Sequence, residues 1–199
     1  MKTTKASSLV GSFQVGNNGT GAVPFVSRTE SAKILGDAVA AALATLAVIT
    51  KRIYFFPVQF QKQTKISKLR VNVTNAASNS VCSVGIYNNK RLTTGNDNPG
   101  DLLEFVDTLI TTTTGDKDAV APFTFNKDTL YWIGVVCGGA PTLRALAISS
   151  LYSHLGRVPN SNNAYTHLYK NLTNYVLPTV APTDLTISTG NIPAVYIVE

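Results

Sequence analysis

The sequence predicts an all-β protein: an antiparallel β-sandwich of the jelly-roll type with an extended N-terminal arm and one short helix. Seven or more short runs of alternating apolar residues follow one another at a spacing of roughly 8–12 residues, which is typical of sandwiches. Only 14% of the 199 residues are charged, and Glu occurs three times whereas Thr occurs 24 times. A helical array would be rich in Glu, Lys and Leu, and β-branched residues favour strands.

The composition also excludes several classes of protein. Hydrophobic residues make up 44% of the chain, which excludes intrinsic disorder despite a net charge of +6. Two cysteines are too few for a disulfide-rich or zinc module. The most apolar window, residues 38–49, is shorter than the roughly 20 residues that a membrane-spanning helix needs, so no membrane partner is expected. Without a secretory signal, we expect folding in a cytoplasm and reduced cysteines.

The N-terminal 50 residues differ from the remainder. Residues 1–29 hold short apolar pieces separated by Gly, Asn, Ser and Pro, which predicts an arm that orders only against another surface. Over residues 30–46, apolar positions recur with helical spacing after the candidate N-cap Thr29, which predicts a helix, although residues 45–50 also fit a strand. We therefore expect an attachment segment over residues 1–50 and a β-sandwich domain over residues 51–199.

The strands of the expected sandwich follow from the alternation of apolar side chains. The run 52–60 contains Pro57, which predicts an edge or bent strand. Residues 88–100 are rich in Asn and Gly and predict a long polar loop. The run 102–110 fits a helix or a strand, and the threonines after it favour the strand. The other expected strands cover residues 66–73, 81–87, 119–125, 130–137, 142–148 and 194–198.

Candidate catalytic residues are few, and we expect no enzyme and no cofactor. Cys82 and Cys137 fall on the apolar side of their strands, which favours buried structural cysteines over a nucleophile paired with a histidine. The acids of the stretch 97–107 and its surroundings lack the spacing of a calcium loop and fit a solvated turn. No metal site is expected.

A basic run covers residues 51–70. It holds Lys51, Arg52, Lys62, Lys65, Lys68 and Arg70 without an acid, interleaved with aromatic residues. Cations with aromatic rings are used by proteins that bind single-stranded nucleic acid. The aromatic residues alternate like core residues, however, so a solvated or subunit-facing basic strand is preferred, and no nucleic-acid partner is expected.

An aromatic and histidine-containing segment is the candidate binding site. It comprises Tyr152, His154, Tyr165, His167 and Tyr169 in a loop-like region. Flat rings beside hydrogen-bond donors suit the stacking of sugars, and loops concentrate binding residues. The alternative is that these rings pack against a neighbouring subunit.

Several segments, read in order, resemble a β-sandwich module of tailed-bacteriophage virion proteins, which occurs in tail fibres, head fibres and decoration proteins. The matching pieces cover roughly residues 50–199, and the most specific is the stretch YWIGVV followed by GAPTLRA. The resemblance implies a non-enzymatic virion component, usually a homotrimer, attached to the particle by its N-terminal segment. It assigns no site residues to this chain.

These inferences define the expected function. We expect a short trimeric fibre or capsid decoration protein, located in the virion after assembly in the host cytoplasm. Its partners are other copies of itself and a capsid or tail protein held by residues 1–50. The alternative is a receptor-binding module that holds host cell-surface glycan during host attachment.

Overall fold

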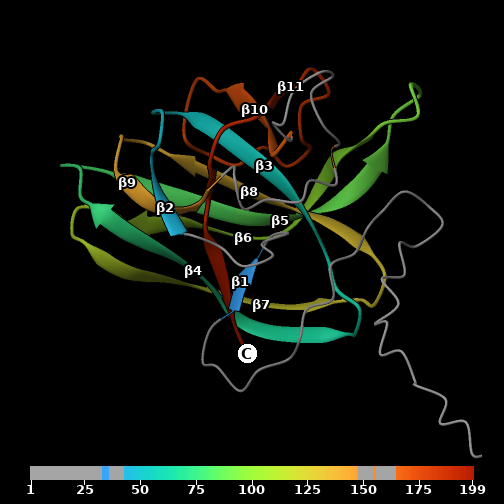
Figure 1. Cartoon of the computed structure of the whole chain (residues 1–199), viewed down its shortest axis with the longest axis horizontal. Coiled ribbons are helices and arrows are strands. Elements are labelled where there is room, and N and C mark those ends of the chain that lie inside the picture. The colour runs from blue at the N-terminus through green and yellow to red at the C-terminus, as the bar shows by residue number, and fades with distance from the viewer. Residues whose placement is uncertain (1–32, 36–42, 148–154, 156–164) are drawn as a thin grey trace, which may run out of the picture.

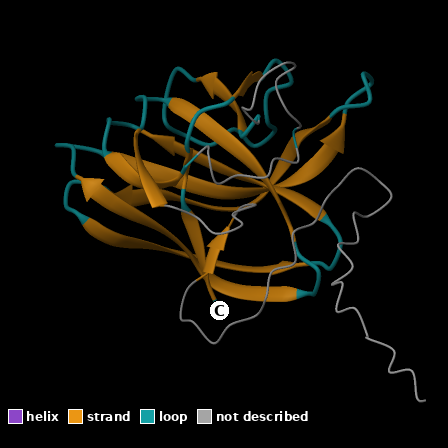
Figure 2. Ribbon diagram, viewed as in Figure 1, coloured by secondary structure: helices purple, strands orange, loops and turns teal. Residues whose placement is uncertain are grey.

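The computed structural model describes residues 33–35, 43–147, 155 and 165–199. These residues form two antiparallel β-sheets, one of seven strands and one of six, and contain no helix (Figures 1 and 2). The main hydrophobic core draws residues from both sheets and lies between them. The prediction of an all-β sandwich is therefore confirmed.

The seven-stranded sheet contains both ends of the described chain. Its path runs β1-β13-β4-β9-β12, β2 pairs with the free side of β9, and β7 pairs along β4. The long strand β4 is the centre of this sheet because it pairs with β7, β13 and β9. The strands are β1 (Lys33–Leu35), β2 (Leu43–Ala47), β4 (Thr64–Asn75), β7 (Gly115–Phe125), β9 (Thr142–Leu146), β12 (Ile192–Pro193) and β13 (Val195–Val198).

The six-stranded sheet has the order β11-β10-β3-β8-β5-β6. Its outermost strands are therefore β11 and β6, which lie at opposite ends of the sheet. The strands are β3 (Arg52–Gln59), β5 (Val81–Arg91), β6 (Asp97–Ile110), β8 (Leu130–Cys137), β10 (His167–Asn171) and β11 (Thr186–Ser188).

The helix predicted over residues 30–46 is wrong for the part that is described. Lys33–Leu35 pairs with β13, and Leu43–Ala47 pairs with β9 (Figure 1). The five residues of β2 are too few to separate a helical from an alternating period, and the unpaired side of β9 supplies ladder hydrogen bonds that favour the strand. Residues 36–42 lie outside the described part. The sandwich thus begins within the expected attachment segment.

Alternation along the strands places the core as the sequence predicts. Leu69, Val71 and Val73 on β4 are buried, and so are the inward residues of β5 and β8. Together with Tyr54 and Phe56 on β3 they form the main cluster between the sheets. This packing explains why a chain with few charges and many β-branched residues folds as two layers.

A second cluster covers the other face of the six-stranded sheet, which is why β3, β5 and β8 are buried on both faces. Ile53, Phe55, Tyr87 and Trp132 form this cluster with residues of the segment 172–185, which we call the strap. The strap is tied to the sheet by backbone hydrogen bonds from Leu102 to Thr179 and from Ala181 to Gly100. The loop-like character predicted for this region is consistent with the strap, and its covering role becomes visible only in three dimensions.

Two expectations about individual strands are corrected. The polar stretch 88–100 is mostly strand, because β5 continues to Arg91 and β6 starts at Asp97, leaving a tight turn with Gly95 at a φ of 84°.

Strand β3 is an inner strand rather than an edge, since it lies between β10 and β8. Its Pro57 is tolerated because β10 pairs with β3 only as far as Phe55.

Candidate functional site

The aromatic segment predicted as a binding site is only partly described. Tyr152 and His154 lie outside the described residues. Tyr165 is half-buried just before β10, whereas His167 and Tyr169 lie on β10 itself. The register pairs Tyr169 with Tyr54 on β3, so His167 and Tyr169 share the face of the sheet that carries Tyr54.

His167 is an interior residue with 3% of its surface exposed. Its ring lies 5.4 Å from that of Tyr54, and its Nδ1 lies 2.9 Å from the hydroxyl of Thr166. That hydroxyl donates its proton to the carbonyl of Gly190 at 2.6 Å, so Nδ1 is assigned as the N–H that donates to Thr166. Burial, and then the nearby charge of Arg52, lowers the pKa of His167 to about 4. A neutral imidazole held in this way contributes to the packing of β10.

Tyr169 is more exposed than His167. The guanidinium carbon of Arg52 lies 4.3 Å from the centre of the Tyr169 ring, and the Arg52 Nε donates a 2.8 Å hydrogen bond to Asn171 Oδ1. We call this arrangement the Arg52–Tyr169 pair. The antiparallel register of β3 and β10 produces it, because Arg52 lies opposite Asn171, two residues from Tyr169. A stacked and oriented guanidinium is suited to holding a carboxylate.

The turn before β3 fixes the position of Arg52. Lys51 has a φ of 60°, a left-handed conformation that residues other than Gly seldom adopt. Its N–H donates to the carbonyl of Cys137 at 2.8 Å, and its carbonyl accepts from the N–H of Leu172 at 2.8 Å. The exposed Ile49 lies in the same turn, since its carbonyl accepts from the N–H of Arg52 at 3.0 Å. The backbone of this turn therefore holds Ile49, Lys51 and Arg52 close to one another.

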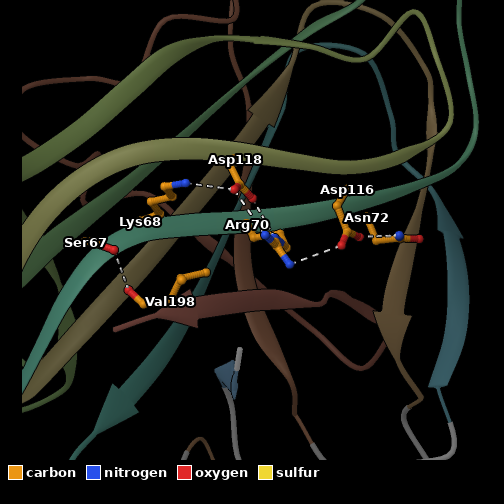
Figure 3. A network of polar contacts seen from close by, with 7 residues as sticks. All are labelled: Ser67, Lys68, Arg70, Asn72, Asp116, Asp118 and Val198. Atoms are coloured by element: carbon orange, nitrogen blue, oxygen red, sulfur yellow. Dashed lines mark hydrogen bonds and ion pairs between the residues drawn. The ribbon is translucent and has the colours of Figure 1, made fainter. Parts of the chain in front are cut away.

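The outward basic face of β4 is neutralised within the chain. Arg70 forms two hydrogen bonds to Asp118, one of them 3.1 Å long, and a third of 3.2 Å to Asp116 (Figure 3). Lys68 Nζ adds an ion pair of 3.3 Å with Asp118. These contacts hold the pKa of the Asp118 carboxyl below its usual range, chiefly through the hydrogen bonds from Arg70. The outward position of Lys68 and Arg70 is confirmed, and the acids of β7 that pair with them were missed in the sequence.

The two cysteines are joined, in contrast to the expected reduced thiols. Cys82 on β5 and Cys137 on β8 form a disulfide with their Cα atoms 4.0 Å apart. The cause is register: the two residues lie directly opposite each other on neighbouring strands and share the inward side of the sheet. Their burial was predicted correctly, and within the described residues no cysteine is free. The signal in the sequence was their shared apolar parity, but pairing of β5 with β8 could not be read from it.

The acids near residue 97 form no cluster. Asp97 and Asp101 accept hydrogen bonds from the side-chain amides of Asn89 and Asn88, at 2.7 and 3.2 Å, across the β5–β6 ladder. Within the described ranges, no group of three or more His, Cys, Asp or Glu side chains is placed to hold a metal ion. These acids are spread along β6, and Asp97 and Asp101 each bind a separate amide on β5.

Strand β6 carries a feature that the sequence analysis missed. Asp101, Leu103, Phe105 and Asp107 occupy every second position of the strand and are all exposed, and the β5–β6 ladder shifts register three times along it. We call them the acidic stripe. The strap pairs with β6 only near residues 100–102, and beyond these the described residues place no strand on the outer side of β6. Unpaired edges with apolar side chains are surfaces on which other chains dock.

Comparison with known proteins adds no relative. No protein-family model matches the chain, and a search of curated proteins finds no match. Among the described residues, no helix is long and apolar enough to cross a membrane.

Proposed function

We propose that this chain is a non-enzymatic structural protein of a phage virion, a short trimeric fibre or decoration protein attached to the capsid or tail through its N-terminal segment. One observation carries the proposal: β6 and β7, an edge strand from each sheet, expose large apolar side chains. Leu103, Phe105 and Ile110 on β6 are 43%, 47% and 61% exposed, and Val120 on β7 is 68% exposed. Apolar edges of this kind suit a protein that lies against neighbouring chains.

Two further points support this proposal. The sequence resembles phage virion β-sandwich modules over roughly residues 50–199, and the all-β sandwich agrees with the fold that this resemblance implies. The Cys82–Cys137 disulfide is compatible with a protein that persists in an extracellular particle, where the surroundings are oxidising. Because β1 and β2 lie in the sandwich, the segment left for attachment is residues 1–32.

Quantitative mass spectrometry of purified particles tests the proposal. The expected result is a fixed copy number per particle, close to a multiple of three, that survives density-gradient purification. Particles produced with a chain lacking residues 2–32 should lose the protein while the soluble fraction retains it. Absence of the full chain from purified particles would refute the proposal.

The second candidate function is binding of host cell-surface glycan. The observation that favours it is the Arg52–Tyr169 pair, because a half-buried ring and an oriented guanidinium can contact a sugar. A glycan array with the wild type and with the double variant Tyr165→Ala, Tyr169→Ala tests it. Binding that disappears in the variant is expected, and an array on which the wild type binds nothing argues against this function.

A further inference from the structure

The Arg52 guanidinium has unused capacity to bind an anion. Its Nε is bound to Asn171 and its face lies on Tyr169, but within the described residues it forms no ion pair. Arg70, by contrast, uses its fork on two aspartates of its own chain. The remaining Arg52 N–H groups form a fork of fixed orientation, the geometry that binds a carboxylate with two hydrogen bonds.

The carboxylates of the acidic stripe lack cationic partners in the described part of their own chain. Asp101 accepts a hydrogen bond from Asn88, but neither Asp101 nor Asp107 has a cationic partner among the described residues. Between them lie the exposed side chains of Leu103 and Phe105. The stripe therefore presents two carboxylates on either side of an apolar centre, on a strand whose outer edge pairs with the strap at Asp101 and carries no described strand beyond residue 102.

The two surfaces match in chemistry and lie on different strands of one sheet, β3 and β6, with β8 and β5 between them. The turn with Arg52 precedes the inner strand β3 and contains two cations and the exposed Ile49, and the Arg52–Tyr169 pair lies on β3 and β10. The acidic stripe lies on β6, an edge strand of the same sheet. Complementary patches at two different places on a protomer form head-to-tail contacts, and such contacts close into a ring when the rotation allows it.

We propose that the acidic stripe of one copy docks on the turn that presents Ile49, Lys51 and Arg52 of the next copy, and that three such contacts close the trimer. This inference rests on the trimer in the proposed function and identifies its interface. The partner is a second copy of this chain because both halves of the contact, opposite in charge and each with exposed apolar side chains, are present in it.

A charge-reversal series in the full chain tests the interface, with light scattering after size exclusion over a range of concentrations. Arg52→Glu, and separately Asp101→Arg with Asp107→Arg, should each raise the trimer dissociation constant at least about 30-fold, as expected for losing one side of a charge contact. Combining all three substitutions in one chain should bring the trimer dissociation constant back to within about fivefold of the wild-type value. Every contact of the ring then contains an acid in place of Arg52 and arginines in place of Asp101 and Asp107. Lys65→Glu is the matched control, an exposed lysine on β4 that should leave the trimer unchanged.

Hydrogen exchange of the wild type gives a readout that needs no variant. Raising the protein concentration through the trimer transition should protect the amides of residues 103–108 that are not bonded to β5, and those of residues 49–52. Protection confined to other strands would overturn the inference.

The remaining outcomes overturn the interface without touching the virion location. A trimer that survives Arg52→Glu and the stripe variant shows that the copies meet elsewhere. Loss of acidic-glycan binding in Arg52→Glu with an unchanged trimer assigns the guanidinium to a sugar carboxylate instead. A wild type that is monomeric at all concentrations removes the interface, whereas its copy number in particles is decided separately by mass spectrometry.

Discussion

The buried centre of the six-stranded sheet and two surface sites on it differ in where their polar groups find partners. At the centre, Trp132 donates its indole N–H to Asn89 at 2.9 Å, and Tyr87 donates its hydroxyl to the carbonyl of Pro178 at 3.0 Å. At the surface sites, Arg52 at the start of β3 and the carboxylate of Asp107 on β6 have no ion-pair partner among the described residues. Groups satisfied within the chain stabilise the fold, and groups left unsatisfied at its surface are available to other molecules.

Removing the disulfide should have the largest effect, and it should act on the centre alone. The bond closes a loop with a sequence separation of 55 residues, for which the chain-entropy relation gives about 4 kcal/mol of stabilisation. The double variant Cys82→Ala, Cys137→Ala should therefore lose about that free energy of unfolding in urea denaturation. Its trimer dissociation constant below the melting transition should stay unchanged. A loss of less than about 1 kcal/mol would contradict the prediction.

Acid should weaken the fold through His167 at the β10 end. Because the folded-state pKa is lowered from 6.5 to about 4, the unfolded chain binds a proton that the folded chain excludes between these values. The contribution of neutral His167 to the free energy of unfolding is therefore fully present above pH 6.5. It falls by up to about 3 kcal/mol as the pH drops to 4. Urea denaturation of the wild type and of His167→Gln at pH 7.0 and 4.5 measures this.

The variant provides the control, because glutamine does not titrate and its stability should change much less over the same interval. Residual acid sensitivity from carboxylates such as Asp118, whose pKa is lowered, appears in both proteins and cancels in the difference. Equal pH slopes for the two proteins would show that His167 takes up its proton in the fold without cost.

Much of this organisation follows from alternation in the sequence, but the partners do not. The parity of Leu69 and Lys68 predicts which face of β4 is buried, because burial is a property of a single strand. The pairing of Arg70 with Asp118 and the bond between Cys82 and Cys137 depend on which strands become neighbours, and the local pattern does not determine that order. For the same reason the short β2 was expected as a helix. Its strand conformation depends on pairing with β9, which its local sequence pattern does not determine.

Releasing the strap should have a smaller effect, confined to the covered face of the sheet. Tyr87→Phe removes the hydroxyl that donates to the Pro178 carbonyl and leaves this acceptor without its partner, at a cost of about 1–2 kcal/mol. Burial raises the pKa of Tyr87, so the hydroxyl is a donor throughout the usual pH range. Hydrogen exchange at Leu102 and Ala181, whose N–H groups bond across the strap contact, should accelerate.

Tyr131→Phe is the matched control for the strap. The Tyr131 hydroxyl accepts a hydrogen bond from the N–H of Asn126 at 3.2 Å, away from the strap. This variant should leave exchange at Leu102 and Ala181 unchanged, even if it lowers stability by a comparable amount. Equal acceleration in both variants would mean that the strap opens only by global unfolding.

The smallest effect on folding should come from Arg52, and this separates assembly from stability. Arg70→Met deprives Asp116 and Asp118 of their shared fork and should cost about 1 kcal/mol in the free energy of unfolding, a typical value for a well-connected surface network. Arg52→Met keeps a side chain on the Tyr169 ring and should cost about 0.5 kcal/mol. In light scattering the order should reverse: Arg52→Met weakens the trimer at least about tenfold, and Arg70→Met leaves it intact. If both arginines affected folding and assembly in the same proportion, the difference between an arginine with ion-pair partners in the described part of its own chain and one without them there would have no functional meaning.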